Sequence, residues 1–285
     1  MVKMRNIILL LLILSLMLPV KVVAQSESTN EINTIMMRST FKIEGTGSCG
    51  SCFIVGKPSK EKHISYLILV TAAHVLENIS GETAVIYLRK KRNDNIFEKF
   101  PFPIKIRNRN NPLWTKNKNG KDIAVMNVNL PIENNNADLR IVSTDLFADD
   151  KYYSDFEIHP GDEMYCLGFP MGAEANQAGF PVLRSGRIAS FPLTPMVTYP
   201  TFLLDFKVYK GNSGGPVYFA DTNRIVNGKI STVRFIAGLV SQEYNVTEKI
   251  QSQYEKTEKT YPLSLAVIIH ASYIKDTINQ LQDLK

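Results

Sequence analysis

The sequence predicts an all-β fold, on the basis of its composition and of a series of short apolar segments. Hydrophobic residues make up 44% of the 285 residues and charged residues 21%, which excludes a disordered chain and favours a packed core. The apolar segments are rich in β-branched and aromatic residues and are separated by Gly, Pro, Asn and Asp, as strands of a barrel or sandwich are. These predicted strands are residues 66–70, 84–88, 123–126, 164–167, 202–204, 217–219 and 235–240.

Polar stretches predict the loops and one boundary. Residues 107–121 are rich in Asn and Lys, and residues 242–260 are mostly polar and predict an extended loop or hairpin. A boundary at 149–160 gives an N-terminal unit of residues 25–150 and a C-terminal unit of residues 151–285. A helix is predicted only at the end of the chain, over about 271–284, where apolar side chains recur at helical spacing.

The first 24 residues predict an export signal. Lys3 and Arg5 precede an apolar run over residues 7–18, and small residues at 22–24 offer a cleavage site before Gln25. The alternative is an uncleaved membrane anchor, but the run is shorter than the ~20 residues that a bilayer span needs. We therefore expect an exported protein, periplasmic or secreted, with no stable membrane insertion once the signal is removed.

The charge balance argues against a nucleic-acid partner. The formal net charge is +6, and three of the basic residues but no acidic residue lie in residues 1–24, so the remainder carries +3. Phosphate recognition would need clustered Lys and Arg. The basic stretch at 107–121 is more typical of a solvated loop than of a docking patch.

Three short motifs carry the chemistry. In the stretch from Lys210 to Pro216, glycines flank Ser213, so that a tight turn can expose the hydroxyl and let backbone N–H groups converge on one point. His74 follows an apolar strand in the run Thr-Ala-Ala-His, and Asp122 opens another strand in Asp-Ile-Ala. Taken singly, each motif is more often structural than catalytic.

Taken together, the motifs resemble those of the trypsin-like (chymotrypsin-fold) serine peptidases. The order His, Asp, Ser and the separations of 48 and 91 residues are similar to that family's, and the resemblance extends over most of residues 40–280. It implies two packed antiparallel six-stranded β-barrels followed by the C-terminal helix. Flanking segments at 45–48, 161–163, 167–170 and 184–190 resemble the bacterial HtrA-like branch, and the chain is expected to lack that branch's PDZ domain.

The resemblance implies a role for each matching residue. Ser213 would be the nucleophile, His74 its general base, and Asp122 the group that orients and stabilises the imidazole. The backbone N–H groups of Gly211 and Ser213 would form the oxyanion hole. Ser241 matches a serine that supports the aspartate and begins the strand edge that pairs with substrate, although the Gln and Glu that follow depart from the family pattern.

Two positions concern activation and specificity. Asn212 stands where trypsin-type zymogens have an aspartate that pairs with a newly cut N-terminus, so no second cleavage is expected to activate the protein. Lys207 matches the family position at the base of the primary pocket, where an ammonium would favour acidic substrates. The alternative is that Lys207 points outward from a pocket closed by Val208 or Val182.

No metal or organic cofactor is implied. The pair Cys49 and Cys52 lacks the two further ligands of a zinc site and the context of a redox motif, so we expect small barrel residues or one local disulfide.

The motifs and the export signal together predict an exported serine endopeptidase that acts on protein or peptide substrates through an acyl-enzyme. The alternatives are a catalytically silent, protease-like protein-binding module and an esterase with the same chemistry.

Overall fold

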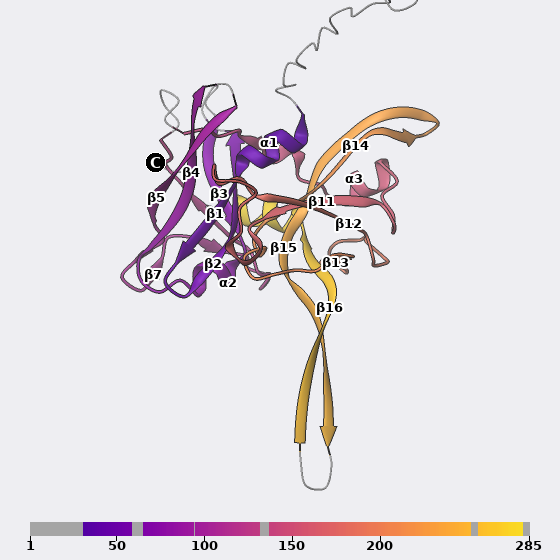
Figure 1. Cartoon of the computed structure of the whole chain (residues 1–285). Coiled ribbons are helices and arrows are strands. Elements are labelled where there is room, and N and C mark those ends of the chain that lie inside the picture. The colour runs from indigo at the N-terminus through magenta and orange to yellow at the C-terminus, as the bar shows by residue number, and fades with distance from the viewer. Residues whose placement is uncertain (1–30, 59–64, 94, 132–136, 252–255, 282–285) are drawn as a thin grey trace, which may run out of the picture.

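The computed structural model describes residues 31–58, 65–93, 95–131, 137–251 and 256–281. Two sheets form the body of the protein, one from each half of the chain (Figure 1). The predicted signal segment and the Asn-rich residues 133–136 lie outside the described residues. Among the described residues, no helix is long and apolar enough to cross a membrane.

The first sheet follows a short helix, α1 (Ile32–Ser39), and consists of eight strands in the order β5-β4-β1-β2-β3-β9-β8, with β10 added in parallel to β2. Its buried side chains come mainly from β1 to β4: in β4 buried residues alternate with more exposed ones, whereas the central strands β2 and β3 are buried along most of their length. Its strands are β1 (Thr40–Gly45), β2 (Ser48–Pro58), β3 (Ser65–Thr71), β4 (Thr83–Asn93), β5 (Ile96–Lys105), β8 (Thr115–Lys116), β9 (Ala124–Asn127) and β10 (Val142–Ser143). The two-residue strands β6 (Arg107–Asn108) and β7 (Asn111–Pro112) pair separately, within the stretch that was expected to be a loop.

The second sheet has six strands in the order β12-β11-β14-β15-β16-β13. A helix, α3 (Asp150–Asp155), lies within the predicted boundary region between the two sheets. The strands are β11 (Glu163–Gly168), β12 (Val182–Arg187), β13 (Thr201–Leu204), β14 (Pro216–Val226), β15 (Lys229–Gln251) and β16 (Lys256–His270). Every strand predicted from the apolar segments therefore falls within an observed strand, or within one residue of one.

The mostly β, chymotrypsin-like class is confirmed, with corrections to the count and closure of the barrels. Among the described residues, the first sheet has eight strands, because the very short β8 and β10 add to its edge and to β2, and its outer strands do not pair with each other. The second sheet has the expected six strands. Its outer strands meet only at an isolated bridge between Ile188 and Leu204, so this sheet is not a fully paired barrel.

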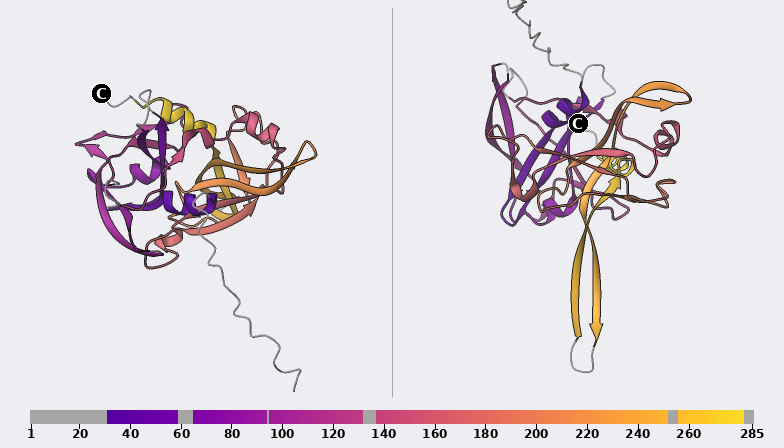
Figure 2. Two further views of the ribbon diagram at one scale, coloured as in Figure 1. Left: turned by 90° about the horizontal axis from the view of Figure 1, so that it is seen from above. Right: turned by 45° about the vertical axis from the view of Figure 1, so that its right-hand side comes forward.

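The C-terminal helix α4 (Ala271–Asn279) packs on the first half of the molecule. It is shorter than predicted within the described residues. Tyr273, Ile274 and Ile278 belong to the core of the first sheet, and the Asn117 amide donates to the Thr277 hydroxyl at 2.8 Å. Seen from above, the yellow helix lies beside the first sheet (Figure 2, left). The end of the chain therefore holds the two halves together.

A buried arginine makes a second link between the halves. Arg89 of β4 is fully buried between the rings of Phe41 and Phe180, with its guanidinium carbon 4.3 and 4.4 Å from their centroids. It donates to the carbonyl oxygens of Gly179, in the second half, and of Thr40. Burial lowers the pKa of Arg89 to about 9, yet the group stays charged near neutral pH and is balanced by carbonyl acceptors.

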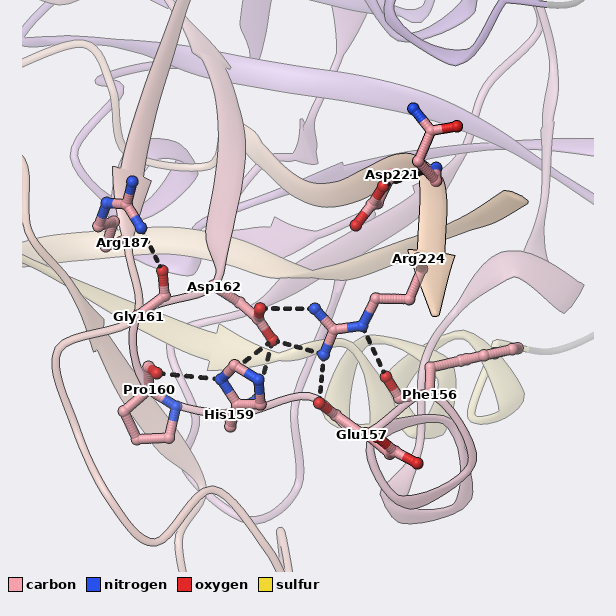
Figure 3. A network of polar contacts seen from close by, with 10 residues as sticks. Phe156, Glu157, His159, Pro160, Gly161, Asp162, Arg187, Asp221 and Arg224 are labelled. Atoms are coloured by element: carbon pink, nitrogen blue, oxygen red, sulfur yellow. Dashed lines mark hydrogen bonds and ion pairs between the residues drawn. The ribbon is translucent and has the colours of Figure 1, made fainter. Parts of the chain in front are cut away.

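Within the second half, a polar cluster fixes the start of β11 to the outer end of β14 (Figure 3). The Arg224 guanidinium binds both carboxylate oxygens of Asp162, at 2.6 and 3.0 Å, and donates to the carbonyl oxygens of Phe156 and Glu157. Asp162 also accepts the backbone N–H of His159 at 3.0 Å. The two charged side chains are only 12% and 9% exposed, so removing one would leave the other buried without its partner.

We expect Arg224→Ala to lower the free energy of unfolding by about 3 kcal/mol, because it leaves the Asp162 carboxylate buried and unpaired. Urea unfolding followed by circular dichroism measures this. Arg92→Ala is the matched control: its ion pair with Glu98 is more than half exposed, and surface pairs contribute about 0–1 kcal/mol. Equal losses in the two variants would contradict the assignment of a structural role to this cluster.

Candidate active site

Adjacent strands of the first sheet bring His74 and Asp122 together. His74 lies in the short helix α2 (Ala73–Glu77), directly after β3, and Asp122 precedes β9 by two residues. Since β3 and β9 pair with Thr71 opposite Ala124, the two side chains emerge at the same end of the sheet. The Nδ1 atom of His74 lies 2.7 Å from Oδ2 of Asp122, and the backbone N–H of His74 donates to Oδ1 at 2.9 Å. With Nδ1 engaged, Nε2 is the ring nitrogen left for other partners.

The Asp122 carboxylate is held in its charged form. Ser241 donates its hydroxyl to Oδ2 at 2.9 Å, so three donors surround this group. Burial by itself would raise the pKa of Asp122, but the hydrogen bonds from the His74 ring and backbone, the charge of the imidazole and the Ser241 hydroxyl together bring it below its ordinary value. The carboxylate can therefore fix the tautomer of the ring and stabilise a positive charge on it.

Ser213 approaches the same place from the second half. It lies in the turn before β14, and it lines a cavity of about 620 Å³ together with His74, Asp122 and Ser241. In this conformation its hydroxyl donates to the carbonyl oxygen of Ser241 at 3.0 Å. The structure thus brings all three residues to one cavity between the two sheets, with Ser213 bonded to Ser241 and the histidine bonded to the aspartate.

The turn before Ser213 has a defined backbone geometry. The N–H of Asn212 donates to the carbonyl oxygen of Tyr209 at 3.0 Å, and Gly211 has φ +98° at the third position of this turn, as a type II turn requires. Ser51 holds the turn from the first half, because its hydroxyl donates to the Gly211 carbonyl oxygen at 2.7 Å. Among the described residues, no acceptor is bound to the backbone N–H of Gly211 or of Ser213. Both groups remain available for an oxygen of a ligand.

Asn212 stabilises the turn from within. It is buried, and its side-chain oxygen accepts the N–H of Tyr209 at 3.0 Å. The neutral amide therefore makes a local contact that needs no charged partner from elsewhere in the chain.

If the Gly211 N–H binds an oxyanion, as the family resemblance implies, Gly211→Ala is expected to lower kcat by about 10²–10³, the usual effect of losing one such donor. A Cβ at this position would lie 2.2 Å from the carbonyl oxygen of Phe169, so the peptide carrying the N–H must tilt. The control is Gly81→Ala, which has a similar φ of +88° and no atom within 4 Å of the added Cβ. Both variants carry backbone strain of about 1–2 kcal/mol, and only Gly211→Ala should lose rate in steady-state peptide hydrolysis. Equal rates would contradict the role of this amide.

The structure corrects the placement of Lys207. The side chains of Phe206 and Val208 are buried, and alternation along this extended stretch turns Lys207 outward, where its ammonium lies 5.4 Å from the Tyr209 ring centroid. Val208 lines the cavity instead, as the alternative interpretation had it. Thr201, Val267 and Ile269 also line the cavity, and so do the charged residues Lys121, Lys210 and Glu243. Lys207 is not among the residues that line it.

The cysteine pair has no metal or redox arrangement among the described residues. Cys49, Cys52 and Cys166 are all free thiols, and burial raises the pKa values of Cys52 and Cys166, the latter to about 12. The described part of the chain contains no group of three or more potential metal ligands. Ser51 of this segment contacts the turn at Gly211, a contact that the motifs did not predict and for which the run of small residues at 49–52 is the available signal.

Comparisons with known proteins identify a family and two structures of low similarity. The family model for the trypsin-like peptidase domain matches residues 50–226, more than half of the chain and a range that contains His74, Asp122 and Ser213. Among solved structures, the inactive form of a serine-to-alanine mutant of Rv3671c from M. tuberculosis H37Rv is 16% identical over 90% of this chain and 94% of that one, with a TM-score of 0.46. An inactive form of the Rv3671c protease is 16% identical over 88% and 92%, with a TM-score of 0.44. A comparison with curated proteins gives no match.

Proposed function

Because this chain belongs to the trypsin-like peptidase domain family, we propose that it is an exported serine endopeptidase that uses Ser213, His74 and Asp122 as a catalytic triad. The observation that carries the proposal is the convergence of these three residues on one cavity, with Asp122 bonded to Nδ1 of His74 at 2.7 Å. The predicted signal sequence at residues 1–24 supports export.

The first half of the reaction forms an acyl-enzyme. When a substrate carbonyl enters the cavity, the Ser213 hydroxyl turns from the Ser241 carbonyl oxygen to Nε2 of His74, which accepts its proton as Oγ attacks. The N–H groups of Gly211 and Ser213 bind the resulting oxyanion. The C–N bond then breaks, His74 gives the proton to the leaving amine, and Asp122 stabilises the transient imidazolium.

The second half returns the enzyme to its starting state. A water molecule gives a proton to His74 and attacks the ester carbonyl, and the same two N–H groups bind the second oxyanion. His74 then returns the proton to Oγ of Ser213 as the acid product leaves. All steps use side chains and backbone groups of this chain, and none requires a cofactor.

Labelling with a fluorophosphonate probe tests the proposed nucleophile. The mature protein should become covalently labelled, Ser213→Ala should not, and Ser185→Ala, which changes an exposed serine of β12, should label like the wild type. Absence of labelling in the wild type would favour the protein-binding module instead.

A second labelling experiment tests whether a newly cut N-terminus is needed to form the active site. Because the Asn212 side chain holds the turn through Tyr209, protein with additional residues before Gln25 should label at the same rate as the mature protein. A requirement for a free, newly cut N-terminus would contradict the proposed route to the active form.

A further inference from the structure

The longest hairpin of the molecule leaves the body at the candidate active site. β15 and β16 pair with each other from Gly238 opposite His270 out to Gln251 opposite Lys256. The outer part of this pair, residues 244–251 and 256–263, projects as an isolated two-stranded ribbon that neither sheet covers (Figure 1; Figure 2, right). Two-stranded ribbons are marginally stable alone in water, and a third strand or a packed face stabilises them.

The inner part of one face of the ribbon is apolar and uncovered, whereas farther out on this face Glu248 lies opposite Lys259 and accepts the Tyr261 hydroxyl at 3.3 Å. Val246 lies opposite Tyr261, and Tyr244 and Leu263 follow at two-residue spacing on the same two strands. These four side chains are each 42–45% exposed. The opposite face is polar: the hydroxyls of Thr247 and Thr260 are hydrogen-bonded there. Four large apolar side chains on one side of a projecting ribbon are typical of an interaction surface.

One edge of the ribbon is continuous with the cavity. Val240 of β15 still exchanges backbone hydrogen bonds with the turn before β14, donating to Gly215 at 3.0 Å and accepting from Gly214 at 2.8 Å. From Ser241 outward, no described strand pairs with this edge of β15. Ser241, Gln242 and Glu243 line the cavity itself. A free strand edge thus begins beside Ser213 and runs out along the ribbon.

The family resemblance already implies that substrate pairs with the strand edge that begins at Ser241. We propose that this pairing continues outward, so that the ribbon binds a more distant part of the substrate segment that precedes the scissile bond, as an added antiparallel strand along the outer edge of β15 from Tyr244 onward. This proposal rests on the proposed peptidase function. β15 runs outward from Ser241, so an antiparallel partner runs inward and delivers its C-terminal end to Ser213. The added strand makes the ribbon three-stranded, and its apolar side chains pack beside Tyr244 and Val246 of β15, on the face that Tyr261 and Leu263 of β16 extend.

The continuity of the edge favours the substrate over other occupants. A substrate polypeptide bound in the cavity must extend beyond its rim. The edge of β15 offers unpaired backbone groups from that rim outward. At about 3.3 Å per residue, the stretch from Gln242 to Gln251 is about 30 Å long, enough for roughly nine substrate residues. The preferred substrate is therefore an extended segment with alternating apolar residues.

Peptides of different length test the proposal. A cleavage site obtained by proteome profiling is placed in a short peptide with four residues before the scissile bond and in a long peptide with ten, of which alternate residues are apolar. A long peptide with N-methyl groups on alternate outer residues cannot pair as a strand.

Two double variants of the protein complete the test. The apolar-face variant combines Val246→Thr with Tyr261→Thr, both of which keep β-propensity. The polar-face control combines Thr247→Ser with Thr260→Ser.

In the wild type and the control, the long peptide should have a kcat/KM about tenfold above that of the short one, through a lower KM. N-methylation and the apolar-face variant should each remove this gain, and cleavage of the short peptide should stay unchanged. Cleavage of both peptides with equal kcat/KM would overturn the ribbon proposal and leave the peptidase intact. Absence of labelling and cleavage would overturn both. Equal kcat/KM together with dimerisation that the apolar-face variant abolishes would assign the ribbon to a second copy of the chain.

Discussion

Ser213→Ala is expected to lower kcat for peptide hydrolysis by about 10⁶. Ser213 supplies the protein atom that forms a covalent bond with the substrate in the proposed reaction, and alanine leaves no nucleophile at that point. The residual rate should come from water attacking a carbonyl that the amides of Gly211 and residue 213 still polarise. Steady-state hydrolysis of a fluorogenic peptide, with exhaustive removal of wild-type contamination, measures the loss.

The double variant Ser213→Ala with His74→Ala sharpens this result. Groups that act as one unit are not additive, so removing the base as well should cost little more than removing the nucleophile alone. His159→Ala is the matched control, since this exposed histidine lies at the Asp162 cluster and should leave the rate unchanged. Independent, multiplying losses in the double variant would show that His74 and Ser213 do not act in the same step.

The candidate catalytic residues can be proposed from the sequence because their motifs are local. A glycine-flanked serine, a histidine after a strand and an aspartate before one are visible without knowing the fold. The structure then places His74 shortly after β3 and Asp122 shortly before β9, and these two strands pair with each other. The predicted strands are found for a similar reason, since their apolar residues alone distinguish them from the turns.

Features that depend on tertiary contacts were not predictable. Helix α1 contains β-branched residues and was missed; its stability comes from burial of Ile32 and Met36 and from the Glu31 side chain, which accepts two backbone N–H groups. Lys207 was misplaced because a shift of one residue in an extended stretch reverses the direction of the side chain. The role of Ser51 depends on a contact with Gly211, 160 residues away.

The face of the projecting ribbon also depends on tertiary structure. The polar composition of residues 242–260 predicts an extended loop or hairpin, and a hairpin forms. Only the register of β15 with β16 places Val246 and Tyr261 opposite each other. The uncovered apolar face is therefore a property of the pairing and not of the composition. The short strands β8 and β10 were missed for a related reason, since two residues give no periodicity.

Asp122→Asn is expected to lower kcat by about 10⁴ while the fold stays intact. An asparagine amide can present an N–H to Nδ1 of His74 and so favours the tautomer with the proton on Nε2, which cannot accept the proton of Ser213. It also removes the negative charge that stabilises the imidazolium. Asp205→Asn, which changes an exposed aspartate, is the control and should retain full activity. A loss of tenfold or less in Asp122→Asn would remove this carboxylate from the mechanism.

The same variant should change the acid stability of the protein, with a sign fixed by the lowered pKa of Asp122. Because the pKa of this carboxyl is lower in the folded state than in the unfolded chain, its ionised form stabilises the fold above about pH 4, and this stabilisation is lost as the pH falls further. Asp122→Asn lacks the group, so its free energy of unfolding should fall less steeply than that of the wild type below pH 4. Urea unfolding at several pH values measures the two slopes. Identical slopes would mean that the hydrogen bonds from His74 and Ser241 do not favour the charged carboxylate, and the electrostatic part of the proposed mechanism would lose its support.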